Sequence, residues 1–318
     1  MSNNIRLLLI GAGPMAVDYA KVIKHLGYDM VVVGRGKESA ATYKAKTGID
    51  IVSGGLDEYL KHYGSNFTHA IVATGIDVLA ENCFSLFNTE IKNVLVEKPA
   101  GLYLDDIKKV YELATSLRKN VFVAYNRRFY SSVEKTREII ESDGGIKSFH
   151  FEFTEWTHKF LELKKSPEML AHLFLGNSTH VVDLAFHIGG VPQKMECFHS
   201  GSFDWHPSAA IFCGAGISQN NALFTYHSNW QSAGRWGVEL LTEKHRIILK
   251  PLEDVHIQKL GSIQIEKVDI DNQIDIDFKP GLYKQLIAFI QGGHKNMCTI
   301  EEHYNNCEFY KRISNYSN

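Results

Sequence analysis

The sequence of 318 residues contains few cysteines, no long apolar run and no long basic run. Its five cysteines are scattered and include no Cys-x-x-Cys pair, so we expect reduced thiols in a cytoplasmic protein. No stretch approaches the roughly 18 apolar residues that a membrane span needs, and no basic leader precedes the first apolar run, so neither a span nor a signal peptide is expected. A net charge of −2 argues against nucleic acid and an anionic membrane surface as partners.

Metal-binding motifs are also missing. The 15 histidines include no His-Glu-x-x-His sequence and form no tight cluster with cysteines, so we expect no metal site. The hydrophobic content of 44% and the charged content of 22% are ordinary for a globular protein. The length is sufficient for two domains, each with a core of its own.

The first part of the chain alternates between two patterns. Apolar runs with strand character occupy 6–10, 30–33, 70–73, 94–96 and 121–124, and stretches with helical spacing occupy 14–26, 38–47, 56–63, 78–88 and 105–118. This alternation predicts a parallel sheet with helices on both faces.

The pattern changes beyond residue 125. Strand-like runs, several joined by short polar turns, occupy 148–156, 195–200, 209–217, 222–230, 237–241, 246–249 and 262–268, and helical stretches occupy 131–142, 178–188, 282–291 and 300–313. Short turns between strands are typical of an antiparallel sheet. We predict one domain over residues 1–122 and a second domain over 123–318, with the end of the chain packing back across the boundary.

A glycine turn follows the first apolar run. Gly11-Ala12-Gly13-Pro14-Met15-Ala16 lies between the predicted strand and the predicted helix. Such a turn directs free backbone N–H groups and the positive end of the helix dipole toward one place, where a pyrophosphate can bind. We therefore predict a dinucleotide cofactor held by Gly11, Gly13, Pro14, Met15 and Ala16.

The end of the second strand bears on which dinucleotide is bound. An NAD site usually has a carboxylate there, which accepts a hydrogen bond from the ribose 2′-hydroxyl. This chain reads Val33-Gly34-Arg35-Gly36-Lys37, with two cations and no carboxylate. A guanidinium group beside a lysine suits a 2′-phosphate, so Gly34 and Arg35 favour NADP. Glu38 could still accept from a 2′-hydroxyl, so NAD stays open.

Three further motifs carry a family resemblance. They are Glu97-Lys98-Pro99 after a buried strand, Tyr125-Asn126-Arg127-Arg128-Phe129 after the next strand, and Asn177-Ser178-Thr179-His180-Val181-Val182-Asp183 at the start of a helix. With the glycine turn, they resemble the Gfo/Idh/MocA family of oxidoreductases over almost the whole chain. The resemblance implies an α/β fold: a Rossmann domain and a C-terminal α+β domain with a large, mostly antiparallel open sheet. It also implies a homo-oligomer, a dimer or tetramer formed through that sheet.

The resemblance also implies roles for individual residues. Lys98 would lie near the nicotinamide and the reacting hydroxyl, and His180 would project toward the substrate as the second catalytic group. The other cofactor contacts that it implies are Thr74, Glu97, Asn126 and Arg128. The family's sugar dehydrogenases often carry an aspartate four residues before the histidine, where this chain has Gly176.

The chemistry of these side chains fits proton transfer. Histidine titrates near neutral pH and can exchange a proton, whereas lysine, whose pKa in water is near 10.4, serves better as a polarising donor unless burial lowers its pKa. With no carboxylate at position 176, His180 is the leading acid/base group, with Lys98 either as its partner or as the group that polarises the substrate oxygen. Asn177 and Asp183 are further candidates for substrate contacts.

Aromatic and cationic side chains could also meet the substrate. Trp156 and Arg235 suit a sugar ring and a phosphate, although packing of the sheet would explain them equally well. The leading hypothesis is therefore an NADP-dependent oxidoreductase of a carbohydrate, including a nucleotide-linked sugar. The alternatives are a non-catalytic regulator that senses a dinucleotide on the same fold, and a reductase of a substrate that is not a sugar.

Overall fold

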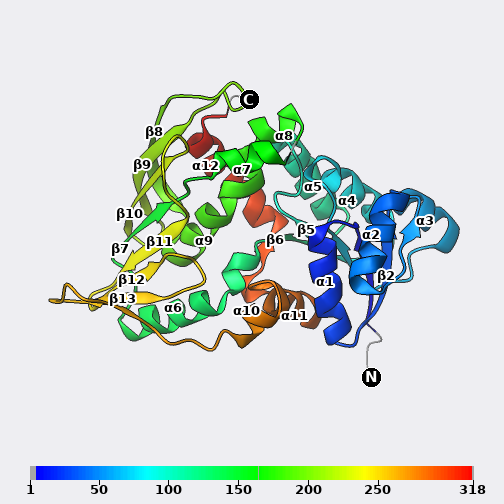
Figure 1. Cartoon of the computed structure of the whole chain (residues 1–318), viewed down its shortest axis with the longest axis horizontal. Helices are drawn as coiled ribbons and strands as arrows, with labels where there is room; N and C mark the ends of the chain where they lie inside the picture. Colours follow the sequence, from blue (N-terminus) through cyan, green and yellow to red (C-terminus); the bar gives the residue numbers. More distant parts are fainter. Residues whose placement is uncertain (1–4, 164, 317–318) are drawn as a thin grey trace. The chain divides into compact units, whose positions relative to one another are not determined.

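The computed structural model describes residues 5–163 and 165–316. The chain forms two compact units, which do not follow a single division of the sequence (Figure 1). The first unit contains Met1–Asn126 and Ile276–Asn305, and the second contains Arg127–Asp275 and Asn306–Asn318. The division into 1–122 and 123–318 expected from the sequence differs from these units, because residues 123–126 and 276–305 group with the first unit. The chain passes between the units three times: directly after Asn126, within α10 (Gln273–Asp277) and within α12 (Ile300–Ser314).

The first unit is built on a seven-stranded sheet in the order β15-β6-β5-β4-β1-β2-β3, in which only the short edge strand β15 is antiparallel to its neighbour. Its strands are β1 (Arg6–Ile10), β2 (Asp29–Gly34), β3 (Val52–Ser53), β4 (His69–Val72), β5 (Asn93–Glu97), β6 (Asn120–Ala124) and β15 (Cys298–Thr299). Its helices are α1 (Pro14–His25), α2 (Lys37–Thr47), α3 (Leu56–Tyr63), α4 (Leu79–Phe87), α5 (Leu104–Ser116) and α11 (Leu282–Gln291).

Helix α1 shows how the sequence sets the ends of an element. Pro14 begins the helix, where the missing N–H of proline costs nothing, and Gly27 follows its last turn with φ of 72°, a left-handed conformation that glycine adopts without strain. Tyr19, Val22 and Ile23 share a fully buried face of the helix. The predicted start of the helix is therefore correct.

From β1 the chain builds the sheet first to one side, through β2 and β3, and then to the other, through β4, β5 and β6. The direction of the strand order therefore switches between β1 and β4. In an open parallel sheet, ligands bind outside the carboxyl ends of the strands at such a switch point. The segments that follow β1, β2, β4, β5 and β6 share that edge. They contain most of the residues predicted to hold a cofactor.

The second unit is built on an eight-stranded sheet in the order β14-β13-β12-β11-β7-β10-β9-β8, mostly antiparallel, with β7 and β10 parallel. Its strands are β7 (Ser148–Glu152), β8 (Pro192–Ser200), β9 (Ile211–Ser218), β10 (Leu223–Asn229), β11 (Gly237–Leu241), β12 (His245–Leu249), β13 (His256–Lys259) and β14 (Ile265–Lys267). Its helices are α6 (Ser131–Ser142), α7 (Thr157–Glu162), α8 (Pro167–Ala171) and α9 (Thr179–Gly189).

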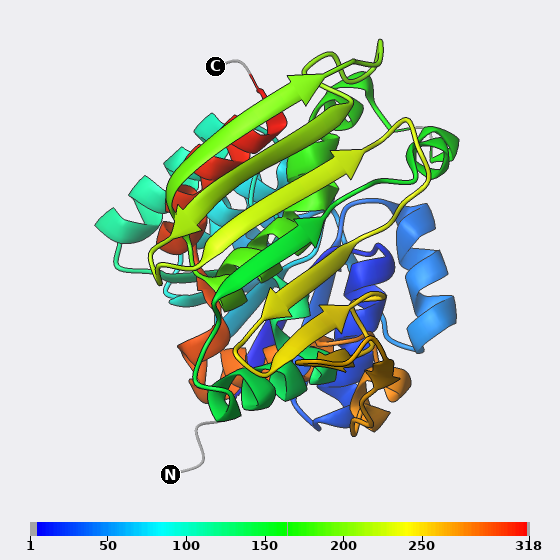
Figure 2. The same cartoon turned by 90° about the vertical axis from the view of Figure 1, so that its left-hand side faces the viewer.

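One face of this sheet is covered and the other is open. Along β10, Phe224 and Tyr226 are buried while Leu223, Thr225 and His227 alternate with them and are exposed. Helix α9 packs against β7 and β11 on the buried face, and Figure 2 shows the strands from the opposite side. A π-helical turn, Phe174–Ser178, leads directly into α9.

The fold class predicted from the sequence is confirmed: a mostly parallel sheet with helices is followed by a mostly antiparallel one. Within residues 5–163 and 165–316, no helix has the length and apolar character needed to cross a bilayer. Six short helices and strands, α7, α8, α10, β3, β13 and β15, were not predicted from the sequence, because so few residues carry little periodic signal.

Candidate functional site

The glycine turn after β1 brings the backbone of two strands into close contact. Gly11 has φ of +129°, and a Cβ atom at this position would lie 2.3 Å from the carbonyl oxygen of Ala73, which follows β4. The N–H of Gly11 donates to the carbonyl of Val33 at 2.8 Å. Only glycine fits this position, whereas a Cβ on Gly13 would meet no atom within 4 Å. The space beside Gly13 is therefore open for a ligand.

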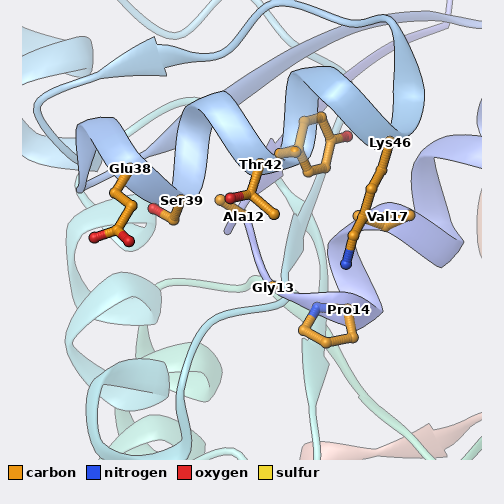
Figure 3. Close-up of a pocket in the computed structure, with 9 residues that line it drawn as sticks. Ala12, Gly13, Pro14, Val17, Glu38, Ser39, Thr42 and Lys46 are labelled. Carbon is orange, nitrogen blue, oxygen red and sulfur yellow. The ribbon is translucent and has the colours of Figure 1, made fainter.

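A pocket with a volume of about 330 Å³ lies against this turn (Figure 3). Its lining comes from the glycine turn, α1 and α2, and consists of Ala12, Gly13, Pro14, Val17, Glu38, Ser39, Thr42, Tyr43 and Lys46. In Figure 3, Glu38 and Lys46 lie toward opposite ends of the row of side chains from α2. The carboxylate of Glu38, the hydroxyls of Ser39 and Thr42 and the ammonium group of Lys46 thus offer both donors and acceptors to a polar ligand. Ser39, Thr42 and Lys46 were missed in the sequence, where nothing distinguished them from other residues of a surface helix.

The segment between β2 and α2 carries two exposed cations. Arg35 and Lys37 are exposed, and within the described ranges 5–163 and 165–316 neither forms an ion pair. Gly34 is buried at the end of β2, where an added Cβ would meet the side chain of Ile51 at 3.1 Å. Glu38 also lines the pocket, so one carboxylate and two cations lie within four residues of one another at the start of α2.

Three predicted residues follow neighbouring parallel strands. Thr74 follows β4, Lys98 follows β5 and Asn126 follows β6, so the carboxyl ends of these strands place their segments along one edge of the sheet. Lys98 is half-buried. Asn126 is 4% exposed and its side-chain amide donates to the carbonyl of Pro280 at 2.9 Å.

The Glu97-Lys98-Pro99 turn is held from two sides. The hydroxyl of Tyr19, on α1, donates to the Glu97 carboxylate at 2.9 Å, and burial together with this carboxylate raises the pKa of Tyr19. On the other side, His303 Nε2 lies 2.9 Å from the Pro99 carbonyl. A carbonyl only accepts, so Nε2 carries the proton and Nδ1 can accept from the Tyr125 hydroxyl at 3.3 Å. These contacts fix the backbone on both sides of Lys98.

In the second unit, two predicted residues bind each other. The Arg128 guanidinium donates to both carboxylate oxygens of Asp183, at 2.8 and 2.5 Å, and both side chains are 1% exposed. A bidentate pair of this kind fixes the geometry of both groups. The pair joins the segment after β6 to α9. The two residues therefore have a structural role in addition to the binding roles predicted for them.

His180 lies near an aromatic and cationic cluster. It is 8% exposed, and its ring centre is 6.1 Å from that of Trp236. The Arg235 guanidinium stacks between two rings, 4.4 Å from Trp236 and 4.7 Å from Trp156, and the Arg127 guanidinium lies 4.6 Å from Trp236. One face of the half-exposed Trp156 is therefore occupied by Arg235, which leaves less of its ring for a sugar.

The sequence analysis missed Glu155, which binds several of the predicted residues. The carboxylate accepts from the side chains of Asn177 at 3.0 Å and Ser178 at 2.6 Å, and lies 3.4 Å from Arg235. Burial raises the pKa of Glu155 to about 7, although these donors act to lower it. The alternation of Phe151, Phe153 and Glu155 could have shown that this carboxylate points to the buried face.

The predicted site residues thus fall into two groups. The first unit contains the predicted residues of the glycine turn and of the end of β2, together with Thr74, Glu97, Lys98 and Asn126. Arg128, Trp156, Asn177, His180, Asp183 and Arg235 belong to the second unit. Contacts through Glu155 and Trp236 join three of them, Asn177, His180 and Arg235. Met15 is half-buried on α1, and Ala16 is fully buried in the core.

The first unit matches a known family. Residues 5–125 match the model of the Gfo/Idh/MocA proteins, described as an oxidoreductase family with an NAD-binding Rossmann fold. Over this part of its length the chain is similar to the Gfo/Idh/MocA oxidoreductases. The resemblance found from the motifs is therefore confirmed, and the pocket beside the glycine turn is part of an NAD-binding domain. No curated protein sequence matches the chain.

Solved structures match nearly the whole chain at low sequence identity. UDP-N-acetylglucosamine 3-dehydrogenase GnnA from Acidithiobacillus ferrooxidans is 13% identical with a TM-score of 0.75, over 97% of this chain and 96% of that one. Levoglucosan dehydrogenase, in complex with NADH and levoglucosan, is 15% identical with a TM-score of 0.75, over 97% and 96%. A putative NADPH-dependent oxidoreductase from Desulfitobacterium hafniense is 14% identical with a TM-score of 0.77, over 99% and 95%. At these identities the likeness establishes the fold.

Proposed function

We propose that the protein is an NADP(H)-dependent oxidoreductase that transfers a hydride between the nicotinamide and a hydroxyl or ketone of a carbohydrate. The observation that carries the proposal is the pocket against the glycine turn, formed by residues of an NAD-binding oxidoreductase family. Its open space at Gly13 and its polar lining suit a dinucleotide. The bound nicotinamide supplies the hydride chemistry.

The preference for NADP is supported by charge. Arg35 and Lys37 follow β2 as exposed cations without ion pairs in the described part of the chain, and Lys46 lines the pocket. Their positive charge favours a 2′-phosphate. NAD is the alternative, because Glu38 lines the same pocket and could bind the 2′-hydroxyl, and because relatives of this fold bind NADH.

Lys98 and His180 are proposed as the catalytic pair. The ammonium group of Lys98 would donate a hydrogen bond to the reacting oxygen of the substrate and so stabilise negative charge on it. His180 would take the hydroxyl proton when the alcohol is oxidised, and return it when the ketone is reduced. The turn around Lys98 is held by His303 and by Tyr19, which suits a residue that has to keep a fixed position.

A carbohydrate substrate is supported by the structural relatives that act on a nucleotide sugar and on levoglucosan. Asn177, Asp183, Trp156 and Arg235 are the proposed contacts, with Arg235 available to a phosphate because 39% of its side chain is exposed. A cytoplasmic location and a homo-oligomer formed through the open sheet complete the proposal.

The test begins with cofactor binding, measured by titrating the protein into NADPH and into NADH and following the fluorescence of the reduced nicotinamide. We expect tighter binding of NADPH. UDP-N-acetylglucosamine and levoglucosan are then tried as substrates with the oxidised cofactor, by following absorbance of the reduced form. No binding of either dinucleotide would overturn the proposal, and binding without turnover of any sugar would favour the non-catalytic regulator.

A further inference from the structure

A buried carboxylate lies beside the helix that carries His180. Glu155 is 1% exposed and stands in the loop between β7 and α7. Its two oxygens accept hydrogen bonds from the Asn177 amide, and one of them accepts a third, shorter bond from Ser178 Oγ at 2.6 Å. A buried carboxylate is costly unless such donors surround it, so the site is built around this group.

The residues that Glu155 binds lead directly to His180. Asn177 and Ser178 end the π-helical turn Phe174–Ser178, and α9 begins at the next residue. His180 is the second residue of α9, so a shift of the turn would move its side chain as well. π-Helical turns are uncommon and frequently lie at functional sites.

Glu155 also contacts the other side of the cluster around His180. It pairs with Arg235 at 3.4 Å, and Arg235 stacks on Trp236, whose ring is 6.1 Å from that of His180. The Arg127 guanidinium, stacked on Trp236, adds a second positive charge near the carboxylate. One group therefore touches both the segment that precedes His180 and the arginine that packs against its aromatic neighbour.

The other buried carboxylates of the unit are engaged elsewhere. Among the described residues, Asp183 binds Arg128, and Asp143 binds Thr242 and His245. Position 176, within the turn, is glycine and brings no carboxylate of its own. Glu155 is thus the buried carboxylate whose contacts reach the residues before His180.

We propose that Glu155 is a positioning residue for His180, acting through Asn177 and Ser178 on one side and through Arg235 and Trp236 on the other. The inference rests on the proposed function only for the role of His180 in catalysis. The placement of the imidazole is a separate property that can be measured without turnover. Burial raises the pKa of Glu155 to about 7, and the positive charges that face it are those of Arg235 and Arg127. The Glu155 carboxyl therefore gains or loses its proton near neutral pH, and its hydrogen bonds to Asn177 and Ser178 change with it.

The test follows the ring signal of His180 by NMR, assigned with the variant His180→Gln. The tryptophan ring nearby displaces this signal by its ring current, so the signal reports how the two rings lie. We expect Glu155→Gln, which keeps the shape but removes the charge, to move the His180 signal by more than its line width. Glu162→Gln is the control, because Glu162 lies at the end of α7, seven residues after Glu155, and its exposed carboxylate pairs with Lys159.

A second variant reaches the same contact from the opposite side. Ser178→Ala removes the 2.6 Å donor without changing any charge, and we expect a smaller displacement of the His180 signal. If the signal stays unchanged in both Glu155→Gln and Ser178→Ala, the proposal is wrong. Far-UV circular dichroism and the affinity for NADPH check that each variant is folded.

Activity then separates the two proposals. With a sugar that the wild type oxidises, Glu155→Gln should lower kcat more than it raises KM, and the pH profile should lose its step near pH 7. Glu162→Gln should keep the wild-type profile. If no sugar is oxidised by the wild type, the proposed function fails while the NMR result still decides the role of Glu155.

Discussion

The two units present functional residues in different ways. In the first, the strands are buried on both faces, as in β1 and β4, and the candidate pocket is formed by a backbone turn and the start of a helix. In the second, burial alternates along β10, and the candidate site is a set of side chains that bind one another across long stretches of sequence. The first unit relies on backbone geometry, and the second on side-chain pairing.

This difference predicts where each unit is sensitive. A change at the glycine turn alters the path of the backbone, whereas a change in the second unit leaves a buried charge without its partner. The first kind of change should affect cofactor binding, and also stability where the turn touches a neighbouring strand, as at Gly11. The second kind should affect stability or substrate chemistry. Four sets of variants test this distinction.

The largest effect is expected for Lys98→Ala in the first unit. Loss of the donor to the reacting oxygen should lower kcat by about 10²–10⁴-fold, since a polarising or acid/base group contributes on this order. The dissociation constant of NADPH should stay at the wild-type value, because the pocket beside α2 is intact. Steady-state kinetics and fluorescence titration measure the two quantities.

Lys92→Ala is the matched control for Lys98→Ala. Lys92 is exposed and precedes β5, at the opposite end of the same strand. It should leave kcat unchanged. Equal rates in the two variants would remove Lys98 from the catalytic pair.

In the second unit, Arg128→Met should destabilise the fold. It leaves the buried Asp183 carboxylate without its bidentate partner, which costs about 3–5 kcal/mol of unfolding free energy. The double variant Arg128→Met with Asp183→Leu should recover much of this loss, since no isolated charge remains. Urea unfolding measures both. Removal of the exposed Lys135–Glu138 pair by Lys135→Met, in contrast, should cost at most about 0.5 kcal/mol.

A different result would favour the binding roles predicted from the sequence. If Arg128→Met has the unfolding free energy of the wild type but binds NADPH weakly, Arg128 acts as a cofactor contact. The structural role of the Arg128–Asp183 pair would then be wrong.

Gly11→Ala and Gly13→Ala separate folding from binding within one turn. At Gly11, the positive φ and the 2.3 Å approach to Ala73 make any side chain strained, and we expect a loss of about 3 kcal/mol in unfolding free energy. At Gly13 a methyl group meets no protein atom, so stability should hold while NADPH binds less tightly. Thermal unfolding and fluorescence titration together decide this. Equal unfolding free energies of the two variants would contradict the close contact at Gly11 and the open space at Gly13.

More of the candidate site could be predicted from the sequence in the first unit than in the second, because the residues of the first lie close together along the chain. The glycine turn, Arg35 and the residues after β4 and β5 are read from short strand–turn–helix segments, in which every needed residue is adjacent. Glu155 lies 23 residues from Ser178 and 80 from Arg235, and no local pattern indicates contacts over such distances. The pairing of Arg128 with Asp183, 55 residues apart, was likewise read as two separate binding residues.

The smallest expected effect is a change of cofactor preference in Arg35→Ala. Losing a charge-assisted hydrogen bond to the 2′-phosphate should weaken NADPH binding about tenfold and leave NADH binding nearly unchanged. Lys44→Ala is the control, because Lys44 lies on the same helix α2 but pairs with Asp50. Equal weakening of both cofactors would contradict the phosphate contact. Glu38→Gln would then be expected to weaken NADH specifically, because its carboxylate lines the same pocket and would bind the 2′-hydroxyl.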